Sequence, residues 1–187
     1  NRLAIGRTEG AGNLYYTAHF RASLPVPQVQ PLDRGIAISR SYYNPNDRNT
    51  AVSSAVVGET LLARLTIVVP DDLHYVVIDD YLPAGLEAID SSLRTTQQIG
   101  APDPYTEEQG AFGSRGWGWW YFNHVQLRDE RVVISSRYLP AGTYEYVYLV
   151  RATTAGQFNT IPPTAFEFYF PEVYGRGAGQ LFTVTQE

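Results

Sequence analysis

The stretch Leu61-Leu62-Ala63-Arg64-Leu65-Thr66-Ile67-Val68-Val69 decides the fold class of this chain. Every odd-numbered position in it is apolar, whereas Arg64 and Thr66 fall on even-numbered positions. A period of two residues is typical of a β-strand that buries one face. The same alternation recurs over 144–151, where Tyr144, Tyr146, Tyr148 and Val150 are interleaved with Glu145, Val147, Leu149 and Arg151.

Further strands and the turns between them extend this pattern along the chain. Short runs rich in Tyr and β-branched residues predict strands at 14–20, 36–43, 75–79, 121–127, 131–137, 165–170 and 181–185. Pro and Gly place turns at 82–85 and 139–142, a tight hairpin is expected at 128–131, and Pro162-Pro163 must leave the ladder. One short helix is predicted at 90–98. The fold class expected is all-β, an antiparallel β-sandwich with at most one short helix.

Composition excludes several classes of function. The chain has 187 residues and a net charge of -5, its 14 basic residues are all Arg, and Lys, Cys and Met are absent. Scattered Arg residues and a negative net charge argue against nucleic acid as the partner. No apolar run approaches the ~20 residues of a membrane span. Without Cys or Lys, disulfides, Cys-ligated zinc and Schiff-base chemistry are excluded.

The first 33 residues differ from the rest in organisation. One alternating strand at 14–20 is followed by Pro25, Pro27 and Pro31, and such a Pro cluster is typical of a linker. We therefore expect residues 1–33 to be the trailing strand and linker of a preceding domain. Residues 34–187 are then expected to form the sandwich.

Catalytic and metal-binding motifs do not emerge from the sequence. His19, His74 and His124 lie about fifty residues apart, and Ser114 has no nucleophile elbow around it. The turn 44–47 offers oxygen ligands for Ca²⁺ but lacks the rest of an EF-hand loop, which favours a plain turn. We predict no catalytic residue, no cofactor and no metal, and we rank a hydrolase below two non-catalytic hypotheses.

The strongest single feature is the aromatic run Gly116-Trp117-Gly118-Trp119-Trp120-Tyr121, which closes a Gly-rich segment at 99–120. Its three Trp residues can serve as an exposed platform for a protein partner or for sugar rings. Alternatively, Trp117 and Trp119 fold the segment back over one end of the sandwich. A carbohydrate-binding module would require coplanar exposed rings, and this is the alternative function.

The C-terminal part resembles the C-terminal domain of bacterial alpha-2-macroglobulins. The resemblance lies in Asp129-Glu130-Arg131-Val132-Val133-Ile134, in 139–148, in Val150–Phe158 followed by Ile161-Pro162-Pro163, and in 168–176. An earlier hairpin, 77–87, resembles the same domain. The segment 10–16 resembles the last strand of the CUB-like domain that precedes it. Only 99–120 falls outside the resemblance.

This resemblance implies a non-catalytic domain of a large periplasmic or extracellular cell-envelope protein that traps proteases, an endopeptidase inhibitor. Its partners would be the other domains of the same protein and, through the complete protein, target proteases. The domain would help gate the change that follows cleavage of a bait segment. A thioester, where one exists, would lie in a helical domain before residue 1, because this chain has no Cys. The candidate interdomain contacts are Trp117, Trp119, Trp120 and Tyr121, with Tyr169 and Tyr174 second.

Two departures from the family pattern concern the segment that we expect to face other domains. Phe168 stands where the family often has Met, and Gly177 where it often has Ser or Thr. The absence of Lys means that the receptor binding of eukaryotic relatives does not carry over.

Overall fold

The computed structural model describes residues 2–7, 9–19, 22–90 and 115–186. Within these ranges the fold is all-β, which confirms the predicted class. The only helical elements are two 3₁₀ turns, η1 (Val26–Gln28) and η2 (Trp119–Tyr121), and no helix there has the length and apolarity that crossing a membrane requires. Of the helix predicted at 90–98, Asp90 is not helical and the remainder lies outside the described residues.

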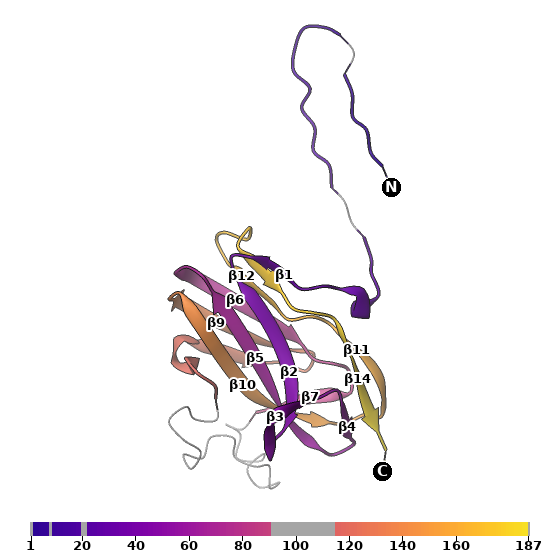
Figure 1. Ribbon diagram of the computed structural model, residues 1–187, viewed down its shortest axis with the longest axis vertical. Coiled ribbons are helices and arrows are strands. Elements are labelled where there is room, and N and C mark those ends of the chain that lie inside the picture. The colour runs from indigo at the N-terminus through magenta and orange to yellow at the C-terminus, as the bar shows by residue number, and fades with distance from the viewer. Residues whose placement is uncertain (1, 8, 20–21, 91–114, 187) are drawn as a thin grey trace.

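Two large sheets pack face to face as a sandwich (Figure 1). The first has six strands in the order β1-β13-β12-β6-β9-β8. Their bounds are β1 Leu32–Arg34, β13 Tyr174–Arg176, β12 Thr164–Glu167, β6 Leu73–Tyr81, β9 Arg131–Leu139 and β8 His124–Leu127.

The second sheet has five strands in the order β3-β2-β5-β10-β7. They are β3 Asp47–Val52, β2 Ala37–Asn44, β5 Thr60–Val69, β10 Gly142–Ala152 and β7 Leu86–Ile89. A smaller sheet joins β11 Gly156–Thr160, β14 Gln180–Thr185 and β4 Ser54–Val56. All described pairings are antiparallel except that of β14 with β4.

The predicted alternation positions the core. Leu61, Leu65 and Ile67 on β5 are fully buried between the sheets, as the period of two requires. One departure is that Leu62 and Leu149, on the opposite face, are also buried. They form a second apolar cluster with Val147, against which Tyr43 and Ile89 pack.

A buried ion pair joins the two large sheets through the core. Arg40 on β2 donates a hydrogen bond to Asp80 on β6, and both side chains are almost completely buried. Tyr148 on β10 donates to the same carboxylate at 2.5 Å. The Arg40 guanidinium also donates to the carbonyl oxygens of Tyr81, at 2.7 Å, and Ile161, at 3.0 Å. The break predicted at 161–163 thus frees a carbonyl that Arg40 uses.

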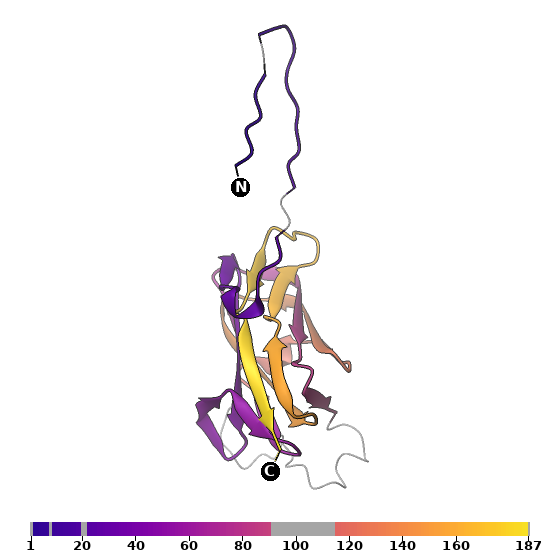
Figure 2. The ribbon, with the colours of Figure 1, turned by 90° about the vertical axis from the view of Figure 1, so that its right-hand side faces the viewer.

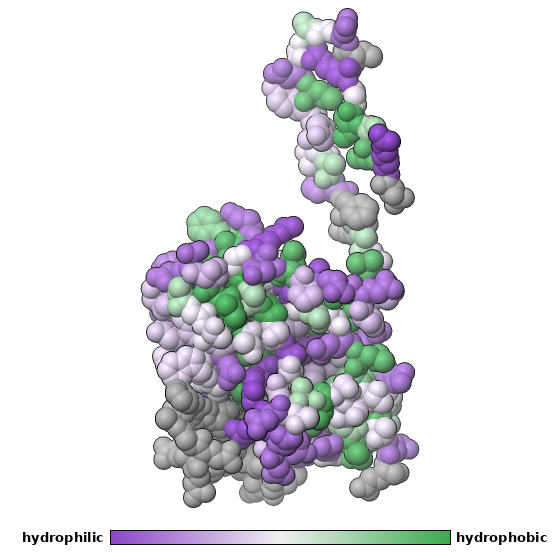
Figure 3. Space-filling model, in the orientation of Figure 1, coloured by the Kyte–Doolittle hydropathy of each residue, from purple (hydrophilic) through white to green (hydrophobic). Residues whose placement is uncertain are grey.

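The predicted turns and most predicted strands are present, but the strand predicted at 14–20 is not formed among its described residues. Residues 14–19 run extended and clear of the sandwich, as one leg of an arm whose other leg is 2–7 (Figures 1 and 2). Figure 3 shows apolar surface along this arm. Leu3 and Leu14 are exposed. Alternation alone makes no strand here, because the described chain offers these residues no sheet to join.

The Arg40–Asp80 pair gives the first test of this architecture. We expect Asp80→Asn to lower the free energy of unfolding by about 3–5 kcal/mol, because it leaves the Arg40 charge buried without a counter-ion. Neighbouring Asp79 pairs with partly exposed Arg131 at 2.9 Å, so Asp79→Asn is the matched control and should cost about 1 kcal/mol or less. Urea denaturation measures both. Equal losses would show that the buried pair does not tie the sheets together.

Candidate functional site

The Trp-rich segment is bound to the edge of β10. The amide of Glu145 donates to the carbonyl oxygen of Trp117 at 2.8 Å, and the amide of Val147 donates to that of Arg115 at 2.9 Å. These two bonds extend the sheet by a short length of backbone on the side of β10 that faces away from β5. The aromatic segment is therefore fixed to a central element of the fold.

Two glycines make this close approach possible. Gly116 and Gly118 have φ angles of 92° and 78°, a region that disfavours side chains. A Cβ on Gly116 would lie 2.5 Å from the carbonyl oxygen of Glu145, and one on Gly118 would overlap the ring of Tyr144. The alternation of Gly and Trp thus lets the backbone lie flat on β10.

The three Trp side chains remain accessible although their backbone is anchored. Their exposed fractions are 47% for Trp117, 37% for Trp119 and 51% for Trp120. Trp120 meets Trp117 edge to face, with ring centroids 5.3 Å apart, and the Arg115 guanidinium lies 4.7 Å from the ring centre of Trp119. The segment does not bury its Trp residues in the sandwich, so the predicted contact candidates Trp117, Trp119 and Trp120 all lie at the surface.

Tyr121 joins this cluster to the core. Its ring packs edge to face on Tyr144 at 5.4 Å, and Phe122 then packs on the same Tyr144 and on Tyr146. Tyr121 is half-buried and contacts both Trp120 and Tyr144, so it contributes less exposed surface than the Trp residues do.

The geometry disfavours the sugar-platform alternative. Rings that stack on a pyranose need to lie in one plane, whereas Trp117 and Trp119 are inclined to Trp120 at 82° and 79°. The cluster therefore presents ring edges and corners, which suit an irregular apolar surface better than a flat sugar ring.

A second exposed aromatic group lies at the turn between β12 and β13. Phe168, Tyr169 and Phe170 are all more than half exposed, and Tyr169 packs edge to face on Tyr75 at 5.2 Å. Candidate Tyr169 belongs to this group. Candidate Tyr174 does not, because it is half-buried on β13, where it pairs with Arg34 and Phe166.

Tyr75 belongs to this aromatic group although the sequence pattern did not predict it as a site residue. This residue has a φ of 53°, which is uncommon for a non-glycine residue, and the ladder between β6 and β9 skips it. Its side chain is 52% exposed, and its carbonyl accepts a hydrogen bond from the amide of Phe168 at 2.9 Å. A strand pattern does not reveal this positive φ.

Asp72 fixes the surface near Tyr75 by accepting two hydrogen bonds. Its carboxylate accepts hydrogen bonds from the Tyr138 hydroxyl at 2.6 Å and from the Ala141 amide at 2.9 Å. The Tyr138 hydrogen bond is the main reason that the pKa of Asp72 lies below its usual value. His74 stacks on Tyr138 with ring centroids 5.1 Å apart.

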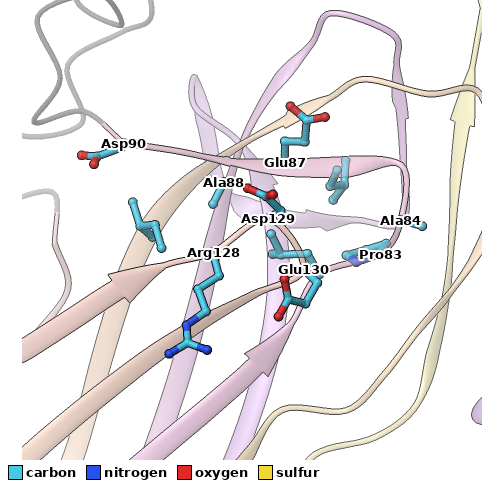
Figure 4. Close-up of a pocket in the computed structure, with 11 residues that line it drawn as sticks. Pro83, Ala84, Glu87, Ala88, Asp90, Arg128, Asp129 and Glu130 are labelled. Carbon is cyan, nitrogen blue, oxygen red and sulfur yellow. The ribbon is translucent and has the colours of Figure 1, made fainter.

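A groove of about 750 Å³ opens at one edge of the sandwich, between the β6–β7 turn and the β8–β9 hairpin (Figure 4). Glu87, Asp129 and Glu130 give it an acidic rim, and Arg128 points away from them to donate a hydrogen bond to Gln126 at 2.8 Å. Across the described parts of the chain, no group of three or more His, Cys, Asp or Glu side chains is placed to hold a metal ion. We assign no chemistry to this groove.

The remaining candidates from the sequence have structural partners or lie outside the described residues. Asn44 and Asp47 accept hydrogen bonds from backbone amides within their own turn, the arrangement of a plain turn. His124 contacts Gln126, far along the chain from His74. Ser114 lies outside the described residues.

Comparison with protein families and relatives gives a consistent match. The model of the bacterial alpha-2-macroglobulin MG10 domain matches residues 35–172. An alpha-2-macroglobulin homolog of Nostoc is 26% identical over 203 residues, covering 100% of this chain and 10% of the relative. An alpha-2-macroglobulin of Xylella fastidiosa is 27% identical, covering 86% of the chain and 10% of the relative. The chain thus spans about a tenth of the length of these curated relatives.

Solved structures of bacterial alpha-2-macroglobulins also match this chain. The crystal structure of a Salmonella alpha-2-macroglobulin reacted with methylamine matches with a TM-score of 0.64 and 25% identity, covering 84% of this chain and 10% of that one. An Escherichia coli structure that spans domain MG7 to the C-terminus matches with a TM-score of 0.68. Its identity of 22%, over 86% of this chain and 25% of that chain, supports the fold alone.

Gly118→Ala tests whether the Trp cluster is held in place by backbone contact. We expect it to alter the near-ultraviolet circular dichroism of the Trp residues and to destabilise the chain by roughly 1–3 kcal/mol, because the new methyl group collides with Tyr144. Gly58→Ala is the control, because Gly58 also has a positive φ of 90° but open space around it. It should leave the Trp signal unchanged. An unchanged signal in Gly118→Ala would mean that the segment is not anchored.

Proposed function

This chain belongs to the family of bacterial alpha-2-macroglobulin MG10 domains, and from that premise we propose that it is a non-catalytic docking module of a protease-trapping protein. It holds neighbouring domains of the same polypeptide through its exposed aromatic side chains. It helps gate the conformational change that follows cleavage of the bait segment. In the Escherichia coli relative, solved structures include forms activated by trypsin and by porcine elastase, which supports a protease as the trigger.

The observation that carries the docking role is the combination of anchored backbone and exposed Trp side chains at 115–120. Burying an aromatic side chain at an interface contributes about 1–3 kcal/mol. A surface that is rigid before contact loses little conformational entropy on binding, so more of this energy appears as affinity. An exposed Trp cluster of this kind is unfavourable on a surface that stays in water and favourable on a surface that is buried against a partner.

The group around Tyr169 supports a second contact. Tyr75, Phe168 and Phe170 surround Tyr169 and are likewise more than half exposed. Phe168 offers a rigid ring where the family often has a flexible Met, so the contact made here would be more demanding in shape.

We also propose the domain organisation predicted from the sequence, with residues 1–33 as the trailing strand and linker of a CUB-like domain. The arm, described at 2–7 and 9–19, supports this. The alternating apolar side chains of its leg at 14–19 lack a sheet within the described chain and would gain one from a neighbour. A thioester, where the complete protein has one, would lie in another domain. The complete protein would act in the periplasm or outside the cell, as part of the cell envelope.

The docking role predicts a change of shape in the complete protein. We expect Trp117→Ala combined with Trp120→Ala to make the uncut protein sediment more like the elastase-cut form, because the neighbouring domain is held less tightly. Sedimentation velocity measures the shift. Val57→Ala, which truncates an exposed apolar residue outside both aromatic groups, is the matched control and should sediment like the parent.

The role would be contradicted if the double variant and the parent sedimented alike before cleavage and shifted equally after it. The Trp residues would then face solvent in the complete protein as they do in this chain.

A further inference from the structure

The Pro-rich connector does not hang free between the arm and the sandwich. From η1 to Gly35, its backbone follows residues 173–179 in the opposite direction, along the outer edge of the six-stranded sheet (Figure 2). The chain then turns, and Ile36 enters the core. We call residues 26–35 the strap and residues 173–179, on which it lies, the track.

Glycines form the track. A Cβ on Gly179 would overlap the carbonyl oxygen of Val26, and one on Gly175 would overlap that of Ile36. Neither Gly175 nor Gly179 has a φ in the left-handed region, so a side chain is excluded here by contact and not by backbone conformation. The start of the strap at Val26 therefore depends on bare backbone at Gly179, and just beyond its end the core residue Ile36 depends on bare backbone at Gly175.

Hydrogen bonds fix the strap between these ends. The Gly179 amide donates to the Val29 carbonyl at 3.0 Å, and the Arg176 guanidinium donates to the Gln30 carbonyl at 3.1 Å. Next, β1 pairs with β13, with Leu32 opposite Arg176. Gly35 then lies against Val173, the residue where the aromatic turn ends.

The track leads directly into the exposed aromatic turn at 168–173. Val173 closes this turn, because its amide donates to the Phe170 carbonyl at 2.9 Å and its carbonyl accepts from the Glu167 amide at 3.2 Å. The strand β13 that follows is only three residues long and lies between β12 and β1. Without β1 it would become a three-residue edge strand, which has little stability of its own.

We propose that the strap is a mechanical link that couples the position of the N-terminal arm to the order of the aromatic turn at 168–173. When residues 26–35 are seated, β13 is paired on both sides and Val173 is fixed. When the arm is pulled away, the strap leaves the track, β13 loses a partner, and the turn that presents Phe168 and Tyr169 loosens. The link is a property of this chain, so it can fail while the proposed docking role holds, and the reverse is also true.

Hydrogen exchange on the full chain with Gly179→Ala tests the link. We expect amide exchange to accelerate about tenfold or more in the strap and at 168–173, because both then open by local unfolding. The amides of Glu145 and Val147, and the emission of the three Trp residues, should not change, since they report on the far side of β10. Gly6→Ala is the control, because nothing lies near that position.

Faster exchange in the strap with unchanged exchange at 168–173 would overturn the proposal, as would no change in either. Arg176→Met gives a second variant in case Gly179→Ala disturbs the whole sandwich. It removes one donor without adding bulk, and it should accelerate the same two segments to a smaller extent.

A reversible disulfide between β1 and β13 tests whether restoring their pairing also restores slow exchange at 168–173. Because the chain has no Cys, Leu32→Cys with Arg176→Cys creates a single disulfide between the facing positions of β1 and β13. In the Gly179→Ala background, the oxidised form should restore slow exchange at 168–173, and reduction should abolish the rescue. Fast exchange at 168–173 in both redox forms would show that the turn does not depend on the strap.

Discussion

The buried pair of Arg40 and Asp80 is the constraint on which the relative placement of the two large sheets depends. Burial raises the pKa of Asp80 while the guanidinium opposes that shift, so the two charges are tolerable only together and fully hydrogen-bonded. Arg40 adds the carbonyls of Tyr81 and Ile161, and Tyr148 adds its hydroxyl. Apolar contacts are non-directional, so a purely apolar core tolerates a shift of one sheet over the other. These hydrogen bonds are directional, so they fix the two sheets in one relative position.

Strand β10 connects the buried network to the exposed Trp segment. Its Tyr148 is part of the buried network, its Tyr144 lies under Gly118, and the amides of Glu145 and Val147 bind the Trp segment. The exposed Trp side chains are thus connected through β10 to the buried network in the core. On the other sheet, β6 carries Asp80 near one end and Tyr75 near the other, so both aromatic groups are connected to the same ion pair.

Features that depend on neighbouring residues could be predicted from the sequence, whereas features that depend on distant partners could not. The alternation at 61–69 predicted β5 because each residue's burial follows from its own position. Strand β3 is mostly exposed and shows no such period. Arg40 shares the inward-facing positions of Ile38 and Tyr42, but the pattern does not identify Asp80 as its partner on the other sheet. The positive φ of Tyr75 arises within the pairing with β9, sixty residues away. The alternation at 14–20 indicates an amphipathic segment without identifying its partner.

The central claim is that the anchored Trp residues are covered in the complete protein and uncovered when a protease cuts it. Hydroxyl-radical footprinting measures this directly at Trp117, Trp119 and Trp120. Our account predicts low oxidation of these three residues in the uncut complete protein, and high oxidation both in this chain alone and after cleavage. Equal oxidation in all three samples would contradict the account.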